Sequence, residues 1–333
     1  MKHAIIIDNS LTGREYGSLR SFEQQIISKT NAEIIELPNL SNLVLHRFGH
    51  TMTAGRFRNL FFKKKIEINA DVIWCILMGP ENYKLDLFNG WYKKAKYRIV
   101  YLFDTLEHQL PLIQRLFSNN QFNIFITSFN EAVPVLERLT KRKWLHVEQA
   151  VSEFFFKNSE LDRRIIAFSS YGRRDDRFHE LIKSFCRRKG LIYDYTAEIG
   201  GRQIVSNLEL YEKYAFLLQH SVFSISWPVE ITNKQRSGSF SPVTCRWFEA
   251  AMSGSIIIGQ APNNVVYKKY FPKDNVLIFD LKKSDVELMN DIENIWVNRH
   301  VLFEENQEFR NSYKYLWTWQ ARINEIINYI NEK

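Results

Sequence analysis

The stretch SPVTCRWFEAAMSGSIIIG, from Ser241 to Gly259, combines the signals of a helix with those of a buried strand. Ser241 is a favoured N-cap residue and Pro242 suits the first helical position, so we expect the helix to begin there. Gly254 predicts its end, because glycine readily takes the left-handed conformation that closes helices. SIIIG then predicts a short buried strand. A helix that leads straight into an apolar strand is typical of a parallel α/β sheet.

The same alternation of apolar strands and helical patterns extends along the chain on both sides. Strands are predicted at 4–8, 32–37, 71–77, 98–103, 122–127, 163–169, 191–196, 222–226 and 255–259. Helical spacing of apolar residues predicts helices around 19–27, 84–96, 108–117, 129–140, 178–189, 207–219, 283–297, 299–312 and 316–331. The pattern predicts two successive, doubly wound α/β domains.

The periodicity breaks at 148–163, and the domain boundary is placed there. We predict an N-terminal Rossmann-like domain over 1–152 and a second over 153–315. The last segment, 316–333, is predicted to be a helix that packs back on the N-terminal domain. A chain of 333 residues is long for one hydrophobic core and suits two.

Composition and charge narrow the classes of function. Only three cysteines occur, Cys75, Cys186 and Cys245, without metal-ligand spacing, which favours reduced thiols in a cytoplasmic protein. No secretory signal is visible, and no apolar run approaches the ~18 residues of a membrane span. The net charge of +8 fits nucleic acid, an anionic membrane surface or a phosphorylated small molecule. Nucleic acid is not expected, because RNP-like, KH and helix-turn-helix signals are absent.

The start of the helix at Ser241 is a candidate phosphate site. Unpaired backbone N–H groups around Val243 and Thr244 and the positive end of the helix dipole favour an anion there. Arg246 on this helix is a further candidate for binding the nucleotide. Further along, Glu249 has a carboxylate that suits the hydroxyls of a ribose. An ordinary capped helix, in which Glu249 pairs with Arg246, is the alternative, and both interpretations remain open at this point.

The run RWFEAAMSGSIIIG, from Arg246 to Gly259, resembles the E-A-M block of GT-B glycosyltransferases, especially the group-1 and family-4-like enzymes. The order of other motifs agrees. IAFSSYGR, residues 166–173, resembles the first strand of the second domain, and the loop that ends at Gly17 resembles the glycine-rich first loop. The resemblance implies two Rossmann-like domains that face a central cleft. The first domain would bind the acceptor and the second the nucleotide sugar, with the C-terminal helix crossing back.

The resemblance also implies roles for individual residues. Glu249 would bind the ribose, Gly172 with Arg173 and Arg177 would contact the donor diphosphate, and Gly17 would lie near the sugar phosphates. At Ser241 the chain departs from the family, which usually has a second glutamate there, near the donor sugar. Glu230 and Arg236 precede the helix and are candidates for other contacts.

The donor site is expected to take a UDP or GDP sugar. A guanidinium binds phosphate through two hydrogen bonds, so Arg236 is a candidate for a diphosphate or an acidic sugar group; a solvated loop charge is the alternative. Arg173, Arg174 and Arg177 follow a predicted strand and suit a diphosphate leaving group, although Asp175 and Asp176 are placed to neutralise two of them. The aspartate pair is not a DxD motif, so no cofactor and no essential metal are expected.

In the first half, Asp104 follows a predicted strand and is a candidate general base for an acceptor hydroxyl. The alternative is that Asp104 is the N-cap of the next helix. His108 lies four residues on, and His46 and His50 are candidates for the acceptor cleft, although a single histidine is more often structural.

A basic and aromatic segment, HRFGHTMTAGRFRNLFFKKK at 46–65, suits an anionic membrane surface, and WYKKAKYR at 91–98 adds to it. A solvated helix with a phenylalanine stripe toward the core is the alternative. With this surface the enzyme would sit in the cytoplasm or peripherally on the inner face of the plasma membrane.

Together these observations predict a glycosyltransferase that moves a sugar from a nucleotide-diphosphate sugar to a glycan or lipid-linked acceptor. Bacterial surface polysaccharide or glycoconjugate synthesis is the expected setting, and a retaining reaction is the expected chemistry. A sugar-nucleotide epimerase of GT-B fold and a degenerate, non-catalytic nucleotide-binding protein are the alternatives.

Overall fold

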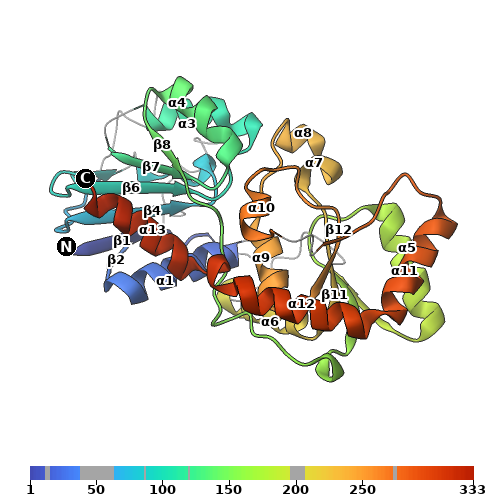
Figure 1. Ribbon diagram of the computed structural model, residues 1–333. Coiled ribbons are helices and arrows are strands. Elements are labelled where there is room, and N and C mark those ends of the chain that lie inside the picture. The colour runs from blue at the N-terminus through green and yellow to red at the C-terminus, as the bar shows by residue number, and fades with distance from the viewer. Residues whose placement is uncertain (12–15, 38–63, 86–87, 119–120, 196–206, 273–275) are drawn as a thin grey trace. The chain divides into compact units, whose positions relative to one another are not determined.

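The computed structural model describes residues 1–11, 16–37, 64–85, 88–118, 121–195, 207–272 and 276–333 (Figure 1). The chain divides into two compact units. The first comprises Met1–Thr12, Leu19–Val147 and Ile327–Lys333, and the second comprises Gly13–Ser18 and Glu148–Ile326. Each unit has its own parallel sheet.

The sheet of the first unit has six parallel strands in the order β2-β1-β4-β6-β7-β8. They are β1 (His3–Ile7), β2 (Glu33–Glu36), β4 (Val72–Leu77), β6 (Tyr97–Leu102), β7 (Ile124–Thr127) and β8 (Trp144–His146). In the register, Ile5 lies between Ile34 on β2 and Trp74 on β4. A separate pair is formed by β3 (Lys64–Lys65) and β5 (Phe88–Asn89). The strand order reverses direction between β1 and β4, which makes that point the topological switch of this sheet.

Helices cover both faces of this sheet. Figure 1 shows α1 (Gly17–Thr30) on one face, and α3 (Leu110–Phe117) and α4 (Val133–Thr140) on the other. Short 3-10 turns at Pro80–Asn82, Glu107–Gln109 and Asn130–Ala132 connect strands to helices. On α1 the fully buried residues Leu19, Phe22 and Ile26 recur at helical spacing and pack on the sheet.

The sheet of the second unit has five parallel strands in the order β10-β9-β11-β12-β13. They are β9 (Ile166–Ser170), β10 (Ile192–Tyr195), β11 (Ser221–Ser226), β12 (Ile256–Gly259) and β13 (Val276–Ile278). The order reverses between β9 and β11, so the switch point lies between these two strands. In open α/β sheets the ligand crevice lies outside the carboxyl ends of the strands at such a point.

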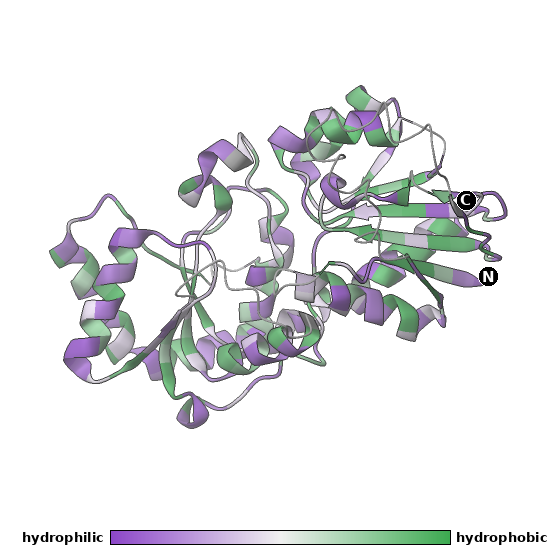
Figure 2. Cartoon of the chain, turned by 180° about the vertical axis from the view of Figure 1, so that it is seen from behind, coloured by the Kyte–Doolittle hydropathy of each residue, from purple (hydrophilic) through white to green (hydrophobic). Residues whose placement is uncertain are grey.

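Two apolar clusters sandwich this sheet. One contains buried residues of α5 (Asp176–Lys189) and α11 (Asp285–Val297), and the other contains those of α6 (Asn207–Gln219), α9 (Cys245–Met252) and α12 (Arg299–Tyr313). Figure 2 shows the hydrophobic residues concentrated along the strands. The remaining short helices are Leu161–Arg163, α7 (Val229–Thr232), α8 (Lys234–Ser237), α10 (Tyr267–Tyr270) and Lys314–Trp317. The last helix, α13 (Trp319–Asn331), begins in the second unit and ends in the first.

Every predicted strand is present, whereas the helix predicted at 84–96 is wrong. In its place the chain forms β5 and a turn at Gly90, whose φ is +87°. Trp91 and Ala95 are buried while the lysines between them are exposed, and this spacing imitates a helical face. The short strands β8 and β13 of the two main sheets were not predicted, nor was the separate pair β3 and β5. Among the helices of the described ranges, none is long and apolar enough to cross a lipid bilayer.

Candidate functional site

The switch point of the second sheet gathers two strand ends that carry polar residues. Beyond β9 the chain continues through Tyr171 to Gly172 and Arg173. Beyond β11 it continues through Trp227 to Glu230, which lies on α7. Both strands run parallel, so their carboxyl ends meet at the same edge of the sheet. This edge is therefore where a ligand is expected.

At this edge the Arg246 guanidinium lies against Gly172, and both residues are predicted to bind the donor. Gly172 has a φ of +93°, and a Cβ atom there would lie 2.3 Å from Arg246 Nη2. Only glycine therefore permits this approach of the guanidinium to the backbone. Arg246 Nη1 is buried and has no hydrogen-bond partner in the described part of the chain. A half-buried guanidinium with one buried nitrogen that lacks a partner, close to a strand end, suits a phosphate.

The helix that carries Arg246 begins later than the sequence predicts. It starts at Cys245 with Thr244 as the N-cap, so the start predicted at Ser241 and Pro242 is wrong. Ser241 is held elsewhere, because its hydroxyl donates to the Glu230 carboxylate and accepts a hydrogen bond from Asn263 N–H at 2.8 Å. These contacts keep the chain before Thr244 out of the helix.

The shift of the helix start also changes which backbone groups can meet a phosphate. The Thr244 side chain makes no capping hydrogen bond, and Val243 is buried at 1% exposure. The first helical N–H, that of Cys245, donates to Gln149 Oε1 at 2.7 Å. A phosphate at this helix would therefore meet the turn at Thr244 to Arg246 rather than Ser241.

Glu249 is buried inside the second unit, at 4% exposure. Its Oε1 accepts hydrogen bonds from the Tyr211 hydroxyl at 2.8 Å and from the Ser18 hydroxyl at 2.9 Å. Burial raises the pKa of this carboxyl, while the hydrogen bonds and the charge of Arg246 oppose that rise. The hydrogen bonds to the Glu249 carboxylate come from hydroxyl groups, and Arg246 acts on it through its charge. The Glu249 carboxylate therefore lies where hydroxyl groups donate hydrogen bonds to it.

Gly17 lies in the same cluster. A Cβ atom at Gly17 would lie 2.6 Å from the ring of Tyr211, so the close packing of these residues depends on the missing side chain. Neither Tyr211 nor Ser18 was predicted, because each lies far along the chain from Glu249 and neither belongs to a motif. The tyrosine pair Tyr211 and Tyr214, three apart on α6, was the only available signal.

The arginines after β9 are used in different ways. Arg177 donates to Asp285 Oδ1 at 2.6 Å and to two backbone carbonyls before α11, so a role with the diphosphate would require it to exchange partners. Arg174 contacts Asp176 at 3.2 Å. Asp175 accepts from Phe178 N–H and caps α5. Arg173 is half-buried next to Gly172 and remains a diphosphate candidate.

Arg236 belongs to α8, but its side chain lies outside the described residues.

In the first unit, Asp104 follows β6, and its N–H donates to Met78 O at 2.6 Å. The N-cap alternative is wrong, because the next 3-10 turn is capped by Leu106. The general-base role of Asp104 stays a prediction, and the neighbouring His108 is exposed. The switch point of this sheet instead presents Asp8, which contacts Lys84 Nζ at 2.5 Å and which the sequence analysis did not identify.

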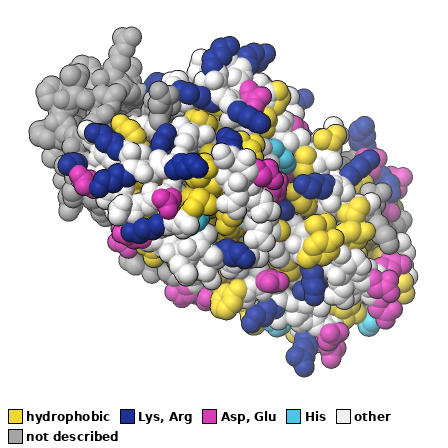
Figure 3. All heavy atoms as spheres, turned by 60° about the vertical axis from the view of Figure 1, so that its left-hand side comes forward, with side chains coloured by type: hydrophobic (Ala, Val, Ile, Leu, Met, Phe, Trp, Pro, Cys, Tyr) yellow, Lys and Arg dark blue, Asp and Glu magenta, His cyan; other side chains and the backbone are white. Residues whose placement is uncertain are grey.

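The surface segments predicted to meet a membrane are only partly described. His46, His50 and most of 46–65 lie outside the described residues. In 91–98 the rings of Trp91 and Tyr97 are buried, the lysines are exposed, and Tyr92 and Arg98 are partly buried. Figure 3 shows many Lys and Arg side chains on one face of the molecule, in keeping with the net charge of +8.

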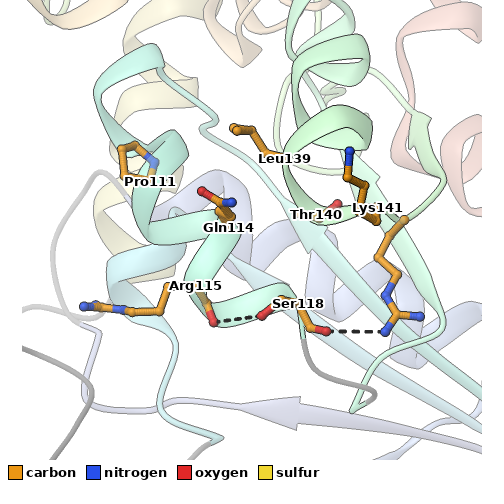
Figure 4. A pocket seen from close by; sticks show the side chains of 8 residues that line it. Pro111, Gln114, Arg115, Ser118, Leu139, Thr140 and Lys141 are labelled. Atoms are coloured by element: carbon orange, nitrogen blue, oxygen red, sulfur yellow. Dashed lines mark hydrogen bonds between the residues drawn. The ribbon is translucent and has the colours of Figure 1, made fainter.

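A surface hollow of about 700 Å³ lies between α3 and α4 (Figure 4). Arg115, Lys141 and Arg142 are among its lining residues, and Arg142 donates to Ser118 O at 3.3 Å. Helix α3 ends beside this hollow and leads back to the start of β7, so the hollow lies at the amino edge of the first sheet. Ligand crevices of such sheets lie at the opposite edge, and we therefore do not assign the donor or acceptor to this hollow.

Solved structures with a similar fold include glycosyltransferases. A glycosyltransferase from Rickettsia africae ESF-5 has a TM-score of 0.52 and 10% identity, over 99% of this chain and 98% of its own. The chain has the GT-B fold. AviGT4, a glycosyltransferase involved in avilamycin A biosynthesis, has a TM-score of 0.48 and 11% identity, over 98% of this chain and 96% of its own. Sucrose-phosphate synthase from Thermosynechococcus elongatus has a TM-score of 0.48 and 12% identity, over 79% of this chain and 73% of its own. No protein-family model matches the chain, and none of the curated proteins compared with it matches in sequence.

The contact between Gly172 and Arg246 in this GT-B unit leads to a first prediction. Gly172→Ala should weaken the binding of a nucleoside diphosphate roughly 10-fold or more, because the new methyl group displaces the guanidinium and a charged hydrogen bond contributes ~1.5–3 kcal/mol. Gly190→Ala is the matched control, since Gly190 also has a positive φ of +65° but faces open space. Isothermal titration with UDP and GDP measures both variants. Equal affinities in the two variants would contradict the assignment of Arg246.

Proposed function

We propose that the protein is a glycosyltransferase that moves a sugar from a UDP or GDP sugar to a glycan or lipid-linked acceptor. The observation that supports this most is the half-buried Arg246 guanidinium, which packs on Gly172 at the switch point. Its buried Nη1 has no hydrogen-bond partner among the described residues. Within a GT-B fold, a cation at the end of the first strand of the second unit suits the diphosphate of a nucleotide sugar.

In this proposal each polar group near the switch point has a distinct role. Arg246 and Arg173 neutralise the charge that develops on the departing diphosphate. The turn at Thr244 offers backbone N–H groups to the same phosphates. Glu249 accepts the ribose hydroxyls, and the reaction proceeds without a cofactor or an essential metal.

The acceptor side of the proposal belongs to the first unit. If configuration is retained, as we propose, the departing phosphate takes the proton of the acceptor hydroxyl and no protein nucleophile is needed. If configuration is inverted, Asp104 is the base. The proposed setting is bacterial surface polysaccharide or glycoconjugate synthesis at the cytoplasmic side of the plasma membrane. The anomeric configuration of the product, read by NMR, separates retention from inversion.

A thermal-shift series with nucleotides tests the donor assignment. UDP or GDP should raise the melting temperature, because a ligand at 100 times its Kd stabilises the native state by ~2.7 kcal/mol. AMP and inorganic phosphate serve as controls and should have little effect. The same diphosphate should not stabilise the Arg246→Met variant. Absence of stabilisation of the wild-type protein by every nucleoside diphosphate would overturn the proposal.

Turnover separates transfer from the two alternative activities. A nucleotide-sugar panel is incubated with and without lipid and glycan extracts, and products are followed by mass spectrometry and NMR. We expect sugar transfer only with an extract. Isomerised donor without any acceptor would identify an epimerase, and nucleotide binding without turnover would identify a degenerate protein.

A further inference from the structure

Glu230 lies directly at the switch point of the second sheet. It follows β11 by four residues and lies on α7, on the opposite side of the switch from Gly172. The two strand ends that flank the expected crevice therefore contribute groups of different kinds. The end of β9 offers the backbone of Gly172 with the Arg246 guanidinium against it, and the end of β11 offers a carboxylate.

The Glu230 carboxylate is held in place by Ser241. The Ser241 hydroxyl donates to Glu230 Oε1 and accepts from Asn263 N–H at 2.8 Å, while the Ser241 carbonyl accepts from Asn264 Nδ2 at 3.0 Å. Ser241 thereby links the loop after β12 to the helix after β11. The orientation of the carboxylate is fixed before any ligand arrives, which lowers the entropy lost on binding.

The second oxygen of the same carboxylate has no hydrogen-bond partner. Glu230 Oε2 is buried, and no donor of the described chain reaches it. The Ser226 hydroxyl and the Trp227 indole N–H, at the same strand end, are also buried and have no hydrogen-bond partner among the residues that the structure describes. Buried polar atoms are nearly always satisfied, and a carboxylate oxygen left without a donor is especially unfavourable. Within the described chain Glu230 Oε2 therefore lacks a donor and the Trp227 N–H lacks an acceptor, and ligand hydroxyl groups, which both donate and accept, suit such a strand end.

The chemistry of the missing donor follows from the charge of the group. A carboxylate repels the phosphates of a nucleotide sugar, so Glu230 does not face the diphosphate that we assign to Arg246. It accepts hydrogen bonds from neutral O–H groups, which the transferred sugar carries in abundance. We propose that Glu230, positioned by Ser241, accepts hydroxyl groups of the donor sugar and sets the selectivity among sugars. This proposal rests on the proposed glycosyltransferase function.

Glu230→Gln tests the proposal with little change in shape. We expect the Kd for UDP or GDP alone to stay within about 2-fold of the wild-type value, because the nucleotide is held elsewhere. The kcat/KM for the preferred nucleotide sugar should fall roughly 10- to 100-fold, as expected when a hydrogen bond to a charged group is lost. The preference for that sugar over its epimers should shrink by a similar factor. Glu212→Gln, an exposed change on α6, is the matched control and should leave every value unchanged.

Ser241 is tested as a positioning residue. Ser241→Ala should reduce sugar selectivity roughly 3- to 10-fold, because a neutral hydrogen bond is worth less than one to a charged group. Ser241→Thr keeps the hydroxyl and should restore selectivity. Melting temperatures without ligand, and the Kd for the nucleoside diphosphate, establish that each variant is folded.

The outcomes separate this proposal from the one on which it rests. If no nucleoside diphosphate binds the wild-type protein, the proposed function itself is wrong. If nucleotide binding and transfer occur but Glu230→Gln keeps full sugar selectivity, only the role of Glu230 is overturned. If Glu230→Gln weakens the binding of UDP or GDP itself, the carboxylate contacts the nucleobase or the ribose. The assignment of Glu230 to the donor sugar is then also overturned.

Discussion

Replacing Arg164 by methionine is expected to lower the free energy of unfolding of the second unit by about 3–5 kcal/mol. Arg164 is only 6% exposed, and its guanidinium donates to Ser159 O at 3.1 Å, Ser221 O at 2.6 Å and Ser253 O at 2.7 Å. Methionine fills much of the space but removes the donor from Ser159 O and Ser253 O, while Ser221 O keeps the Ser255 hydroxyl at 3.0 Å. Each unsatisfied group costs ~1–3 kcal/mol. Water that reaches some of these carbonyls would lower the total cost in unfolding free energy.

The size of this effect follows from what Arg164 connects. It joins the segment before β9 to the start of β11 and to the end of α9, the helix that carries Arg246 and Glu249. Burial lowers the pKa of its guanidinium to about 9, which still leaves the group charged at neutral pH. A cation near the C-terminus of α9 also interacts favourably with the helix dipole.

Chemical denaturation measures the change, with tryptophan fluorescence as the signal. The adjacent Arg163 is exposed, so Arg163→Met is the matched control and should change the unfolding free energy by less than about 0.5 kcal/mol. If Arg164→Met unfolds with the same midpoint and slope as Arg163→Met, the connecting role of Arg164 is wrong.

The strands were predictable because they are decided locally. β4, β9 and β12 are short apolar runs buried on both faces, and such runs are recognisable in a single sequence. The unpredicted strands β8 and β13 have three residues each and lie at sheet edges, where half-exposed residues interrupt the apolar pattern. The number and order of α/β repeats therefore followed from local pattern, and the sheet edges did not.

The candidate site could be predicted only where a motif marks it. Gly172 and Arg246 were both selected from their motifs, but their contact across 74 positions required the fold. The start of α9 was mispredicted because the capping signal of Ser241 competes with a hydrogen bond to Glu230, eleven residues earlier, and with one from Asn263, 22 residues later. Long-range hydrogen bonds of this kind leave no periodicity in the sequence.

Glu249→Gln is expected to weaken the binding of UDP or GDP roughly 10- to 100-fold while leaving inorganic pyrophosphate binding unchanged. The carboxylate already accepts hydrogen bonds from the hydroxyl groups of Tyr211 and Ser18, so its surroundings suit O–H donors. The two hydroxyl groups of a ribose are donors of the same kind. Hydrogen bonds to a charged acceptor are worth ~1.5–3 kcal/mol, and an amide keeps the shape without the charge. Titration calorimetry with the nucleotide and with pyrophosphate measures the two affinities.

The pH dependence makes this prediction sharper. Burial raises the pKa of Glu249 above its usual value, so nucleotide affinity should rise as pH increases through that pKa and the carboxylate forms. Stability should change in the opposite direction. Between the unfolded pKa of about 4.5 and the raised folded value, the folded protein binds the proton more tightly, so the contribution of Glu249 to stability falls as pH rises. Both dependences should be flat in Glu249→Gln.

Tyr211→Phe provides the matched control, because it removes one hydrogen bond to the carboxylate and keeps the charge. The Tyr211 hydroxyl lowers the pKa of Glu249, so its loss should move the midpoint of the affinity profile to higher pH without abolishing nucleotide binding. A Glu249→Gln variant that binds nucleotide as tightly as the wild-type protein at every pH would make Glu249 a structural acceptor for Tyr211 and Ser18. The ribose would then have to be held by another group at the switch point, while the assignment of the diphosphate to Arg246 would be unaffected.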